Sequence, residues 1–520
     1  MASCEIRGAF KPGFDDVLTP HALEFVARLT ERFGARVDEL LATRDQRQAD
    51  IDEGLLPSFA DRTRQIRDLD WIIADIPEDL LDRRVELLTP ARKEAVRAAL
   101  RSEVSVCIAD LEDTLSPTWD NIIQGHRCLQ SAATGTLLAG EGAPPEHPVT
   151  LGMRPRGWHM EEKHLYVDGR PVPAALADFG LYLFHCAQAL TARGSGPYLS
   201  LPKLEGHQEA RLWASVFEFA ENDLGLRQYG IRATAFIETV PAIFEIDEIL
   251  YVLKGYLVGL ECGPADYVFS FIKTLHAHAD FVLPDQLNFD RSAGFLESYS
   301  KLAVRTAHQR SILAIGGTAA SLAASTEQTD KVAFADAVRA QKQREFEMGF
   351  DGTWVGEPGM VPVISEILAE LMPGPNQLSV LGGGEEITAE ALLSPPKGPV
   401  TEPGVRRNIR FALRYLSAWL AGEGCIFFNN RREDMATAES ARAQLWQWVH
   451  HDVTLETGEL MDEHCFRRLL AEELPAAASD LTDLGVAGDR LTLAAELISD
   501  LVLRKDFVPF LSTHAYAHLP

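Results

Sequence analysis

Short apolar runs alternate with longer amphipathic segments through the middle of the chain. Seven of the runs have the length and composition of buried strands, at residues 104–113, 148–157, 196–206, 231–238, 256–263, 311–317 and 351–359. Several of the segments between them show helical periodicity, including 179–193, 208–222 and 295–310. This alternation predicts right-handed β/α units and a parallel sheet.

A closed (β/α)₈ TIM barrel of the α/β class, flanked by helical segments, accounts for residues 101–375. An open, doubly wound sheet is the structural alternative. Closure requires an eighth strand, and the ambiguous run FVLP, which begins at residue 281, is the candidate for it.

Helical patterns dominate both ends of the chain. Residues 1–100 are predicted to form an N-terminal helical segment, with Thr89 as N-cap and Pro90 in the first turn of the helix that contains RKEAVRAALRS. A connection rich in Pro and Gly follows residue 373. Only helices are expected beyond it, so residues 376–520 are predicted to form a C-terminal all-helical domain.

Composition narrows the classes of function. The 520-residue chain is 46% apolar and carries a net charge of −27, which argues against nucleic acid or an anionic membrane as the main partner. It lacks an apolar run long enough to span a bilayer, and its first residues do not resemble a signal peptide. Seven cysteines without CxxC spacing favour a reducing, intracellular location over a disulfide framework or a zinc cluster.

Acidic residues follow three of the predicted strands. Glu238 ends the run 231–238, Asp266 follows the run 256–263, and Asp110, Glu112 and Asp113 end the first run. Because the carboxyl ends of parallel strands share one mouth, these acids should meet there and would repel one another without a cation. Oxygen ligands suit Mg²⁺ better than Zn²⁺. For Glu238 or Asp266 taken singly, a helix cap is the alternative interpretation.

Basic and acidic residues elsewhere add to the candidate site. Arg154 and Arg156 end the second run, where a guanidinium could hold a carboxylate substrate or a developing enolate oxygen. An ion pair that neutralises the acids is the equally good alternative for each arginine. Asp434 precedes a helical run and reads most simply as an N-cap, so these patterns alone do not select it as a catalytic base.

Longer motifs make the chain resemble malate synthases of the shorter, A-type class. They are, in order, RPRGWHMEEKH, DFGLYLFH, GPYLSLPKLEG, FIETVPAIFEIDEILY, GLECG followed by DYVFSFIK, IGGTAA, DGTW and EDMATAE. The match covers most of the chain, and FIETVPA is highly specific to that family. The resemblance implies a TIM barrel with an N-terminal helical clasp and a C-terminal helical plug. It also implies a Mg²⁺-dependent enzyme of the glyoxylate cycle that condenses acetyl-CoA with glyoxylate and hydrolyses the thioester to malate and CoA.

The resemblance assigns the metal site residue by residue. Glu238 and Asp266 would be the metal ligands. Glu112 and Asp110 would lie close by, in contact with a ligand or with a metal-bound water.

The resemblance also assigns catalytic and substrate-binding roles. Arg154 would hold glyoxylate and stabilise the enolate, and Asp434 would take a proton from the acetyl methyl group. Trp354 and Pro358, in TWVGEP, would line the CoA channel, although core packing explains Trp354 equally well.

Three motifs depart from the family pattern near the expected mouth. Where family members have GRWDY this chain has Gly263, Pro264 and Ala265 before the aspartate, in a loop that in the family presents amides to the glyoxylate carboxylate. Pro264 removes one of those N–H groups. Glu357 replaces the histidine of TWVAHP, and REDMAT replaces MEDAAT. The changes leave the metal and base positions intact.

These departures keep other functions open. A related Claisen-condensing enzyme could use another 2-oxo acid or acyl-CoA in the space left by Ala265. A malyl-CoA lyase type of activity is less expected, because such relatives lack the long helical domain that carries Asp434. A non-catalytic metabolite-binding paralogue is the third alternative. The expected location is cytoplasmic, since the ending AYAHLP does not resemble a peroxisomal SKL signal, and no oligomeric state is predicted.

Overall fold

Eight parallel strands close into a barrel in the computed structural model, which describes residues 3–140, 148–285, 294–319, 328–381, 386–483 and 485–520. The strands, in their order around the barrel, are β2 (Val85–Pro90), β3 (Val106–Asp110), β4 (Thr150–Arg154), β7 (Tyr198–Leu201), β8 (Arg232–Ile237), β9 (Leu257–Cys262), β10 (Leu313–Ala319) and β11 (Gly352–Val355). Pairing of β11 with β2 completes the ring. The predicted closed barrel is therefore present, and the open sheet is excluded.

Seven of the eight strands coincide with the predicted runs, but the eighth does not. The residues near 281 form a 3₁₀ turn, η5 (Ala279–Phe281), and the missing strand is β2, inside the range predicted to be helical. Thr89 and Pro90 lie in that strand, so their predicted capping role is wrong. The helix α3 (Lys93–Ala99) instead follows Arg92, which makes no side-chain cap.

The strand β2 departs from a continuous apolar run because it contributes to a buried polar cluster inside the barrel. Glu86, which faces the interior, pairs with Arg83, and its Oε2 accepts a hydrogen bond of 2.9 Å from Trp354 Nε1. The Arg83 guanidinium also contacts Glu261 of β9 at 3.1 Å. A buried glutamate is stable in a strand only when such partners are present. Apolar side chains fill the interior around the cluster, among them Leu88, Val106, Ile108, Val258, Leu313 and Ile315.

Helices surround the barrel on the outside. They are α4 (Trp119–Ala133), α5 (Ala174–Ala192), α6 (His207–Leu224), α7 (Val240–Phe244), α8 (Ile246–Leu253), α9 (Pro264–Leu275), α10 (Phe295–Gln309), α11 (Gln328–Glu347) and α12 (Val361–Leu371). The first helix after each barrel strand, with α3 after β2 included, begins beyond the carboxyl end of that strand, while α8 follows α7 and α10 follows α9. The residues that join each strand to this first helix therefore lie at the same end of the barrel. That end is where the acidic residues were predicted to meet.

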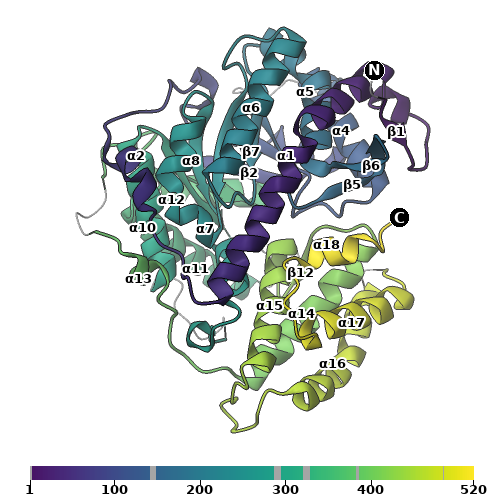
Figure 1. Ribbon diagram of the computed structural model, residues 1–520, viewed down its shortest axis with the longest axis vertical. Coiled ribbons are helices and arrows are strands. Elements are labelled where there is room, and N and C mark those ends of the chain that lie inside the picture. The colour runs from purple at the N-terminus through teal and green to yellow at the C-terminus, as the bar shows by residue number, and fades with distance from the viewer. Residues whose placement is uncertain (1–2, 141–147, 286–293, 320–327, 382–385, 484) are drawn as a thin grey trace.

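The N-terminal region packs against this outer layer. The helix α1 (Pro20–Asp52) begins at the N-cap Thr19, contacts α5 and α6, and runs along the outside of the barrel (Figure 1). Short helix α2 (Arg64–Asp68) contacts α8. A three-stranded sheet of β1 (Glu5–Ile6), β5 (Glu161–Val167) and β6 (Arg170–Pro173) lies outside the barrel ring.

The C-terminal region forms a helical layer with its own apolar core, seen in yellow-green in Figure 1. Its helices are α14 (Glu402–Leu420), α15 (Met435–His450), α16 (Glu463–Asp483), α17 (Gly488–Leu503) and α18 (Leu511–Tyr516), and a short α13 (Ala389–Leu392) precedes them. The α15 helix packs against α9 of the barrel. None of the described helices combines the length and apolarity needed to cross a membrane.

The expectation of helices alone in this region is wrong at one place. A hairpin of β12 (Ile426–Phe428) and β13 (Arg431–Glu433) joins α14 to α15. Its two-residue turn, Asn429 and Asn430, has φ values of 49° and 62°. Asparagine tolerates this left-handed region better than most residues, and two such residues in sequence match the twist of a tight hairpin.

Candidate functional site

The acids predicted from three strand ends do meet at the carboxyl end of the barrel, and a lysine lies among them. The ammonium of Lys203, just after β7, is 3.0 Å from Asp113 Oδ1 and 3.0 Å from Asp266 Oδ1. It is also 3.6 Å from Glu112 Oε1. We call Asp110, Glu112, Asp113, Glu238 and Asp266 the acid cluster.

Glu238 is one of the two most deeply buried acids of the cluster, with Asp110. It follows β8, its side chain is completely buried, and its Oε1 accepts a 2.6 Å hydrogen bond from the Lys203 backbone N–H. Its Oε2 has no hydrogen-bond partner among the described residues. Burial and the neighbouring Asp266 raise the pKa of Glu238 well above its ordinary value, against the opposing effect of Lys203. An unpartnered buried carboxylate oxygen is a group that a cation would stabilise.

Asp266 belongs to the first turn of α9, which places its carboxylate beside Glu238 and Lys203. It does not cap that helix, because the N-cap position is Gly263. The capping alternative for Asp266 is therefore excluded.

Arg154, at the end of β4, is held by two acids. Its guanidinium makes two 2.7 Å hydrogen bonds to the carboxylate of Asp110 and lies 3.3 Å from Asp113 Oδ2. Burial alone would raise the pKa of Asp110, but the adjacent guanidinium brings it below its ordinary value. Asp110 is thus an ionised partner that fixes the orientation of Arg154.

Glu112 lies at the edge of the same cluster. Its Oε2 accepts a 2.5 Å hydrogen bond from the Gly157 N–H, and its Oε1 faces Lys203. Burial raises the pKa of Glu112 to about 8, although Lys203 opposes the shift.

Arg156 does not join this group, contrary to the expectation that both arginines face one mouth. It forms hydrogen bonds of 2.9 and 2.7 Å to Asp178 of α5 and an ion pair of 2.8 Å to Glu162 of β5. Its charge is therefore used to hold the barrel against the three-stranded sheet.

Asp434 comes to the acid cluster from the C-terminal layer. It caps α15, with Oδ1 accepting a 3.2 Å hydrogen bond from the Ala436 N–H, and the next residue, Met435, donates its N–H to the Asp113 carbonyl at 3.4 Å. Burial, followed by the charges of Asp113 and Asp266, raises the pKa of Asp434 to about 7. A carboxylate with this pKa is suited to general base catalysis near neutral pH.

Comparison with known proteins identifies the class of protein that carries such a site. Family models described as malate synthase N-terminal domain, TIM barrel domain and C-terminal domain match residues 3–65, 150–395 and 399–519. The chain belongs to the malate synthase family. Malate synthase of Myxococcus xanthus is 43% identical over 98% of this chain and 95% of its own length. Malate synthase A of Escherichia coli is 41% identical over 96% and 95%.

Membership of the malate synthase family confirms the predicted resemblance, the predicted enzyme class and its link to the glyoxylate cycle. It also agrees with the observed barrel and its helical flanks. A relative named as a glyoxysomal malate synthase, from Candida tropicalis, is 38% identical over 98% of this chain and 95% of its own length.

The loop that departs from the family pattern lies between Glu238 and the C-terminal layer. A Cβ added at Gly263 would come within 2.5 Å of the Phe236 ring and 3.0 Å of Glu238 Oε2, so only glycine fits there. Pro264 begins α9, and the carbonyl of Ala265 accepts a 3.2 Å hydrogen bond from Ser440 Oγ of α15. The loop is therefore positioned by both the barrel and the C-terminal layer.

Trp354 and Pro358 have different surroundings. Trp354 belongs to the barrel interior, where its ring packs edge-on against Phe236 at 5.1 Å and its Nε1 bonds to Glu86. This favours the core-packing alternative over a place in the CoA channel. Pro358 begins a 3₁₀ turn, η6 (Pro358–Met360), after β11 and is partly exposed.

Two central residues were not selected from the sequence. Lys203 lies near the end of the predicted run 196–206, and Asp113 was noted only as part of an acidic group. Both could have been found from their position, because each residue within a few positions of the carboxyl end of a barrel strand is a candidate for the mouth.

The acid cluster fits a hard divalent cation bound by few protein ligands. Among the described residues no group of three or more His, Cys, Asp or Glu side chains surrounds one point, so a site made entirely of protein ligands is not found. Mg²⁺ commonly binds through one or two carboxylates and completes its shell with water and substrate. The unpartnered Oε2 of Glu238 and the neighbouring Asp266 supply such a pair.

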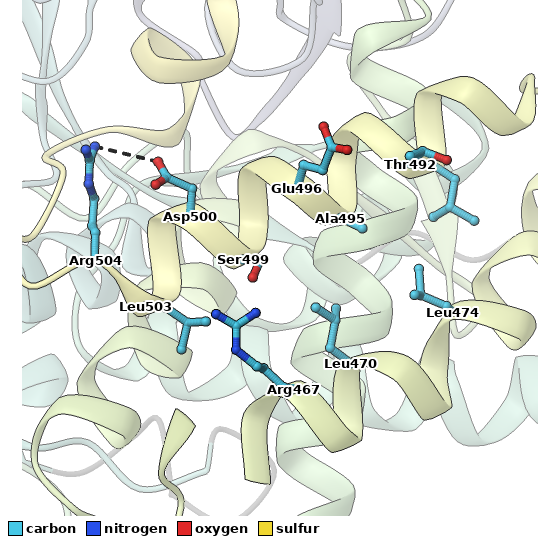
Figure 2. Close-up of a pocket in the computed structure, with 11 residues that line it drawn as sticks. Arg467, Leu470, Leu474, Thr492, Ala495, Glu496, Ser499, Asp500, Leu503 and Arg504 are labelled. Carbon is cyan, nitrogen blue, oxygen red and sulfur yellow. Dashed lines mark ion pairs between the residues drawn. The ribbon is translucent and has the colours of Figure 1, made fainter. Parts of the chain in front are cut away.

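A separate groove lies between α16 and α17 (Figure 2). Its volume is about 720 Å³, and the side chains that line it include Leu470, Leu474, Leu503 and the ion-paired Asp500 and Arg504. None of its lining residues belongs to the acid cluster, so we do not include it in the candidate site.

Proposed function

We propose that this chain condenses acetyl-CoA with glyoxylate and hydrolyses the resulting thioester, giving malate and CoA in a Mg²⁺-dependent reaction. The observation that supports this most directly is the placement of Asp434. A carboxylate from the C-terminal layer, with its pKa raised to about 7, lies beside an acid cluster and a buried arginine contributed by the barrel. Proton removal from a methyl group next to a carbonyl needs this combination of base and positive charge.

Asp434, Arg154 and Asp110 would divide the steps of the reaction between them. Asp434 would accept a proton from the acetyl methyl group. Arg154 would stabilise the enolate oxygen and hold the glyoxylate carboxylate. Asp110 would keep Arg154 in place through its two hydrogen bonds. The methyl carbon would then bond to the aldehyde carbon of glyoxylate, and water would cleave the malyl thioester.

Glu238 and Asp266 would hold Mg²⁺, with Glu112 beside them. When bound, the ion would polarise the aldehyde of glyoxylate. The N–H groups of Ala265 and Asp266, in the first turn of α9, would face the glyoxylate carboxylate; Pro264 has no N–H to contribute. Pro358 would lie at the entrance used by CoA.

We propose a cytoplasmic location for the enzyme. All seven cysteines are free in the structure, and five of them are buried, as expected in a reducing compartment.

Release of free thiol tests the proposal directly. The full chain is mixed with acetyl-CoA and glyoxylate, with MgCl₂ or with EDTA, and the products are identified. We expect thiol release that depends on both substrates and on Mg²⁺, and free malate as the product. Retention of the thioester would indicate lyase chemistry, and substrate binding without thiol release would indicate a non-catalytic paralogue.

A panel of 2-oxo acids tests the effect of Ala265. We expect a clear preference for glyoxylate; a preference for a larger 2-oxo acid would assign the chain to the related Claisen-condensing class.

Glu433→Gln is the matched control for Asp434 variants, because the neighbouring Glu433 accepts its hydrogen bond from Thr437 Oγ1 at 2.8 Å and has no assigned role.

A further inference from the structure

Lys203 is a buried charge that the proposed reaction does not use. Its side chain is 7% exposed, and lysine is rarely buried to this extent unless it is paired. Three acids lie within 3.6 Å of its ammonium: Asp113, Asp266 and Glu112. It therefore occupies the space between two acidic segments that come from different strand ends.

The backbone at Lys203 is strained and firmly held. Its φ of 51° lies in the left-handed region, which is unfavourable for a lysine. Its N–H donates to Glu238 Oε1 at 2.6 Å, and its carbonyl accepts a 2.9 Å hydrogen bond from Arg44 of α1. Arg44 is itself held by Glu209 through bonds of 2.7 and 2.6 Å. Such a conformation persists only where the surrounding structure enforces it, and here α1 and β8 enforce it together.

Acidic groups outnumber basic groups around Lys203. Among the described residues, the acid cluster contributes five carboxylates, and Asp434 lies beside it. Arg154 is already bonded to Asp110 and close to Asp113. Lys203 is the cation that reaches Asp266, the acid that would bind the metal.

We propose that Lys203 is a built-in counter-ion of the acid cluster, a positioning residue that holds Asp113 and Asp266 together in the metal-free protein and weakens the cluster's affinity for a divalent cation. This inference rests on the proposed Mg²⁺ site. Without the ammonium, the acids would repel one another until a metal binds. With it, the cluster is already assembled, but an arriving cation meets a positive charge.

The sign of the effect on metal affinity follows from Coulomb's law. Even with the full screening of bulk water, which sets the lower limit for this buried cluster, a doubly charged ion and an ammonium about 6 Å apart repel one another enough to weaken binding about tenfold. Removal of the lysine charge should therefore tighten Mg²⁺ binding while it destabilises the metal-free fold. A lysine that only filled space would change stability equally with and without metal.

The test compares full-length Lys203→Met with wild type, with Lys203→Arg and with Lys273→Met. Lys273 is the matched control: it is also largely buried, but its Nζ bonds at 2.7 Å to Glu205, outside the acid cluster. Thermal unfolding is measured in EDTA and in saturating MgCl₂, and Mg²⁺ affinity is measured by titration calorimetry.

For Lys203→Met we expect a lower Tm in EDTA, recovery of most of that loss in MgCl₂, and a Kd for Mg²⁺ about tenfold lower than that of wild type. Lys203→Arg should remain close to wild type, and the Tm loss of Lys273→Met should be the same with and without Mg²⁺. The double variant Lys203→Met with Asp113→Asn should regain Tm in EDTA, because one of the repelling charges is removed.

An equal loss of Tm with and without Mg²⁺, or an unchanged or weaker affinity for Mg²⁺, would overturn the inference. If Lys203→Met does not fold in EDTA, its folding in MgCl₂ supports the inference. If Lys203→Met folds in neither EDTA nor MgCl₂ while Lys203→Gln behaves as wild type, the inference is rejected. Wild type that binds no Mg²⁺ would end the proposed metal site and this inference with it. Thiol release that fails while the Tm and affinity changes appear would end only the proposed reaction.

Discussion

Replacement of Asp434 by asparagine separates its observed role as the N-cap of α15 from its proposed role as the catalytic base. Asparagine is as good an N-cap as aspartate, so the hydrogen bond from the Ala436 N–H is retained. The asparagine side chain cannot accept the proton that the proposed base removes from the acetyl methyl group. Removal of the base should lower kcat by about 10²- to 10⁴-fold, which corresponds to about 3–5 kcal/mol of transition-state stabilisation.

The free energy of unfolding of Asp434→Asn should not fall with its kcat. The raised pKa of Asp434 shows that its charge is unfavourable in the fold, first through burial and then through Asp113 and Asp266. The neutral asparagine should therefore leave the free energy of unfolding unchanged or increase it. The alanine variant, which loses the cap, should lose about 1 kcal/mol relative to asparagine.

Three measurements on the same preparations test the proposed role of Asp434. Steady-state thiol release gives kcat, and chemical denaturation gives the free energy of unfolding. Metal and glyoxylate binding, measured by calorimetry, should be nearly unchanged in Asp434→Asn. Turnover within tenfold of wild type would remove Asp434 from the mechanism. A parallel loss of turnover and stability in the Asn and Ala variants would show that it acts only as a cap.

Three further predictions follow from the charges and the packing of the site. Because the proposed base Asp434 must be ionised to act and its pKa is about 7, kcat/KM should rise with pH and reach half its maximum near pH 7. The metal-free fold should lose stability from about pH 4 to pH 7, because the folded protein holds a proton on Asp434 that the unfolded chain has released. A flat pH–rate profile, or a Tm in EDTA that rises over this range, would contradict this prediction. Gly263→Ala should displace Glu238 and weaken Mg²⁺ binding about 10- to 100-fold by calorimetry. An unchanged Kd for Mg²⁺ would show that the loop around Gly263 can move to accommodate the added methyl group. Arg83→Met should lower the free energy of unfolding by about 3–5 kcal/mol, because two buried glutamates lose their partner; a loss below about 1 kcal/mol in urea titration would refute that role.

Much of the fold was predictable because most of its strands are continuous apolar runs. The residue pattern of β2, VELLTP, does not indicate a strand, because it contains a glutamate and ends in Thr-Pro, which also begins many helices. Only the three-dimensional structure supplies the partners of Glu86, namely Arg83 and Trp354, that allow an acid inside the barrel. The hairpin before Asp434 did carry a signal, since two consecutive asparagines favour a tight turn.

The site was predictable in part. The positions of Glu238 and Asp266 after strands placed both acids at one mouth, as observed. The direction in which a side chain points is set by distant contacts, however. Arg154 and Arg156 are two residues apart, yet one turns to Asp110 and the other to Asp178 on α5. Similarly, nothing local to Lys203 reveals that Arg44 and Glu238 hold it among the acids.

The order of the site along the chain has a consequence for protein synthesis. All eight barrel strands and both proposed metal ligands have been translated once the ribosome passes Val355, whereas Asp434 lies well downstream of that point. A nascent or truncated polypeptide can therefore contain the proposed metal ligands and lack the proposed base. Such a fragment should not release thiol from acetyl-CoA, because the proposed reaction requires translation past Asp434.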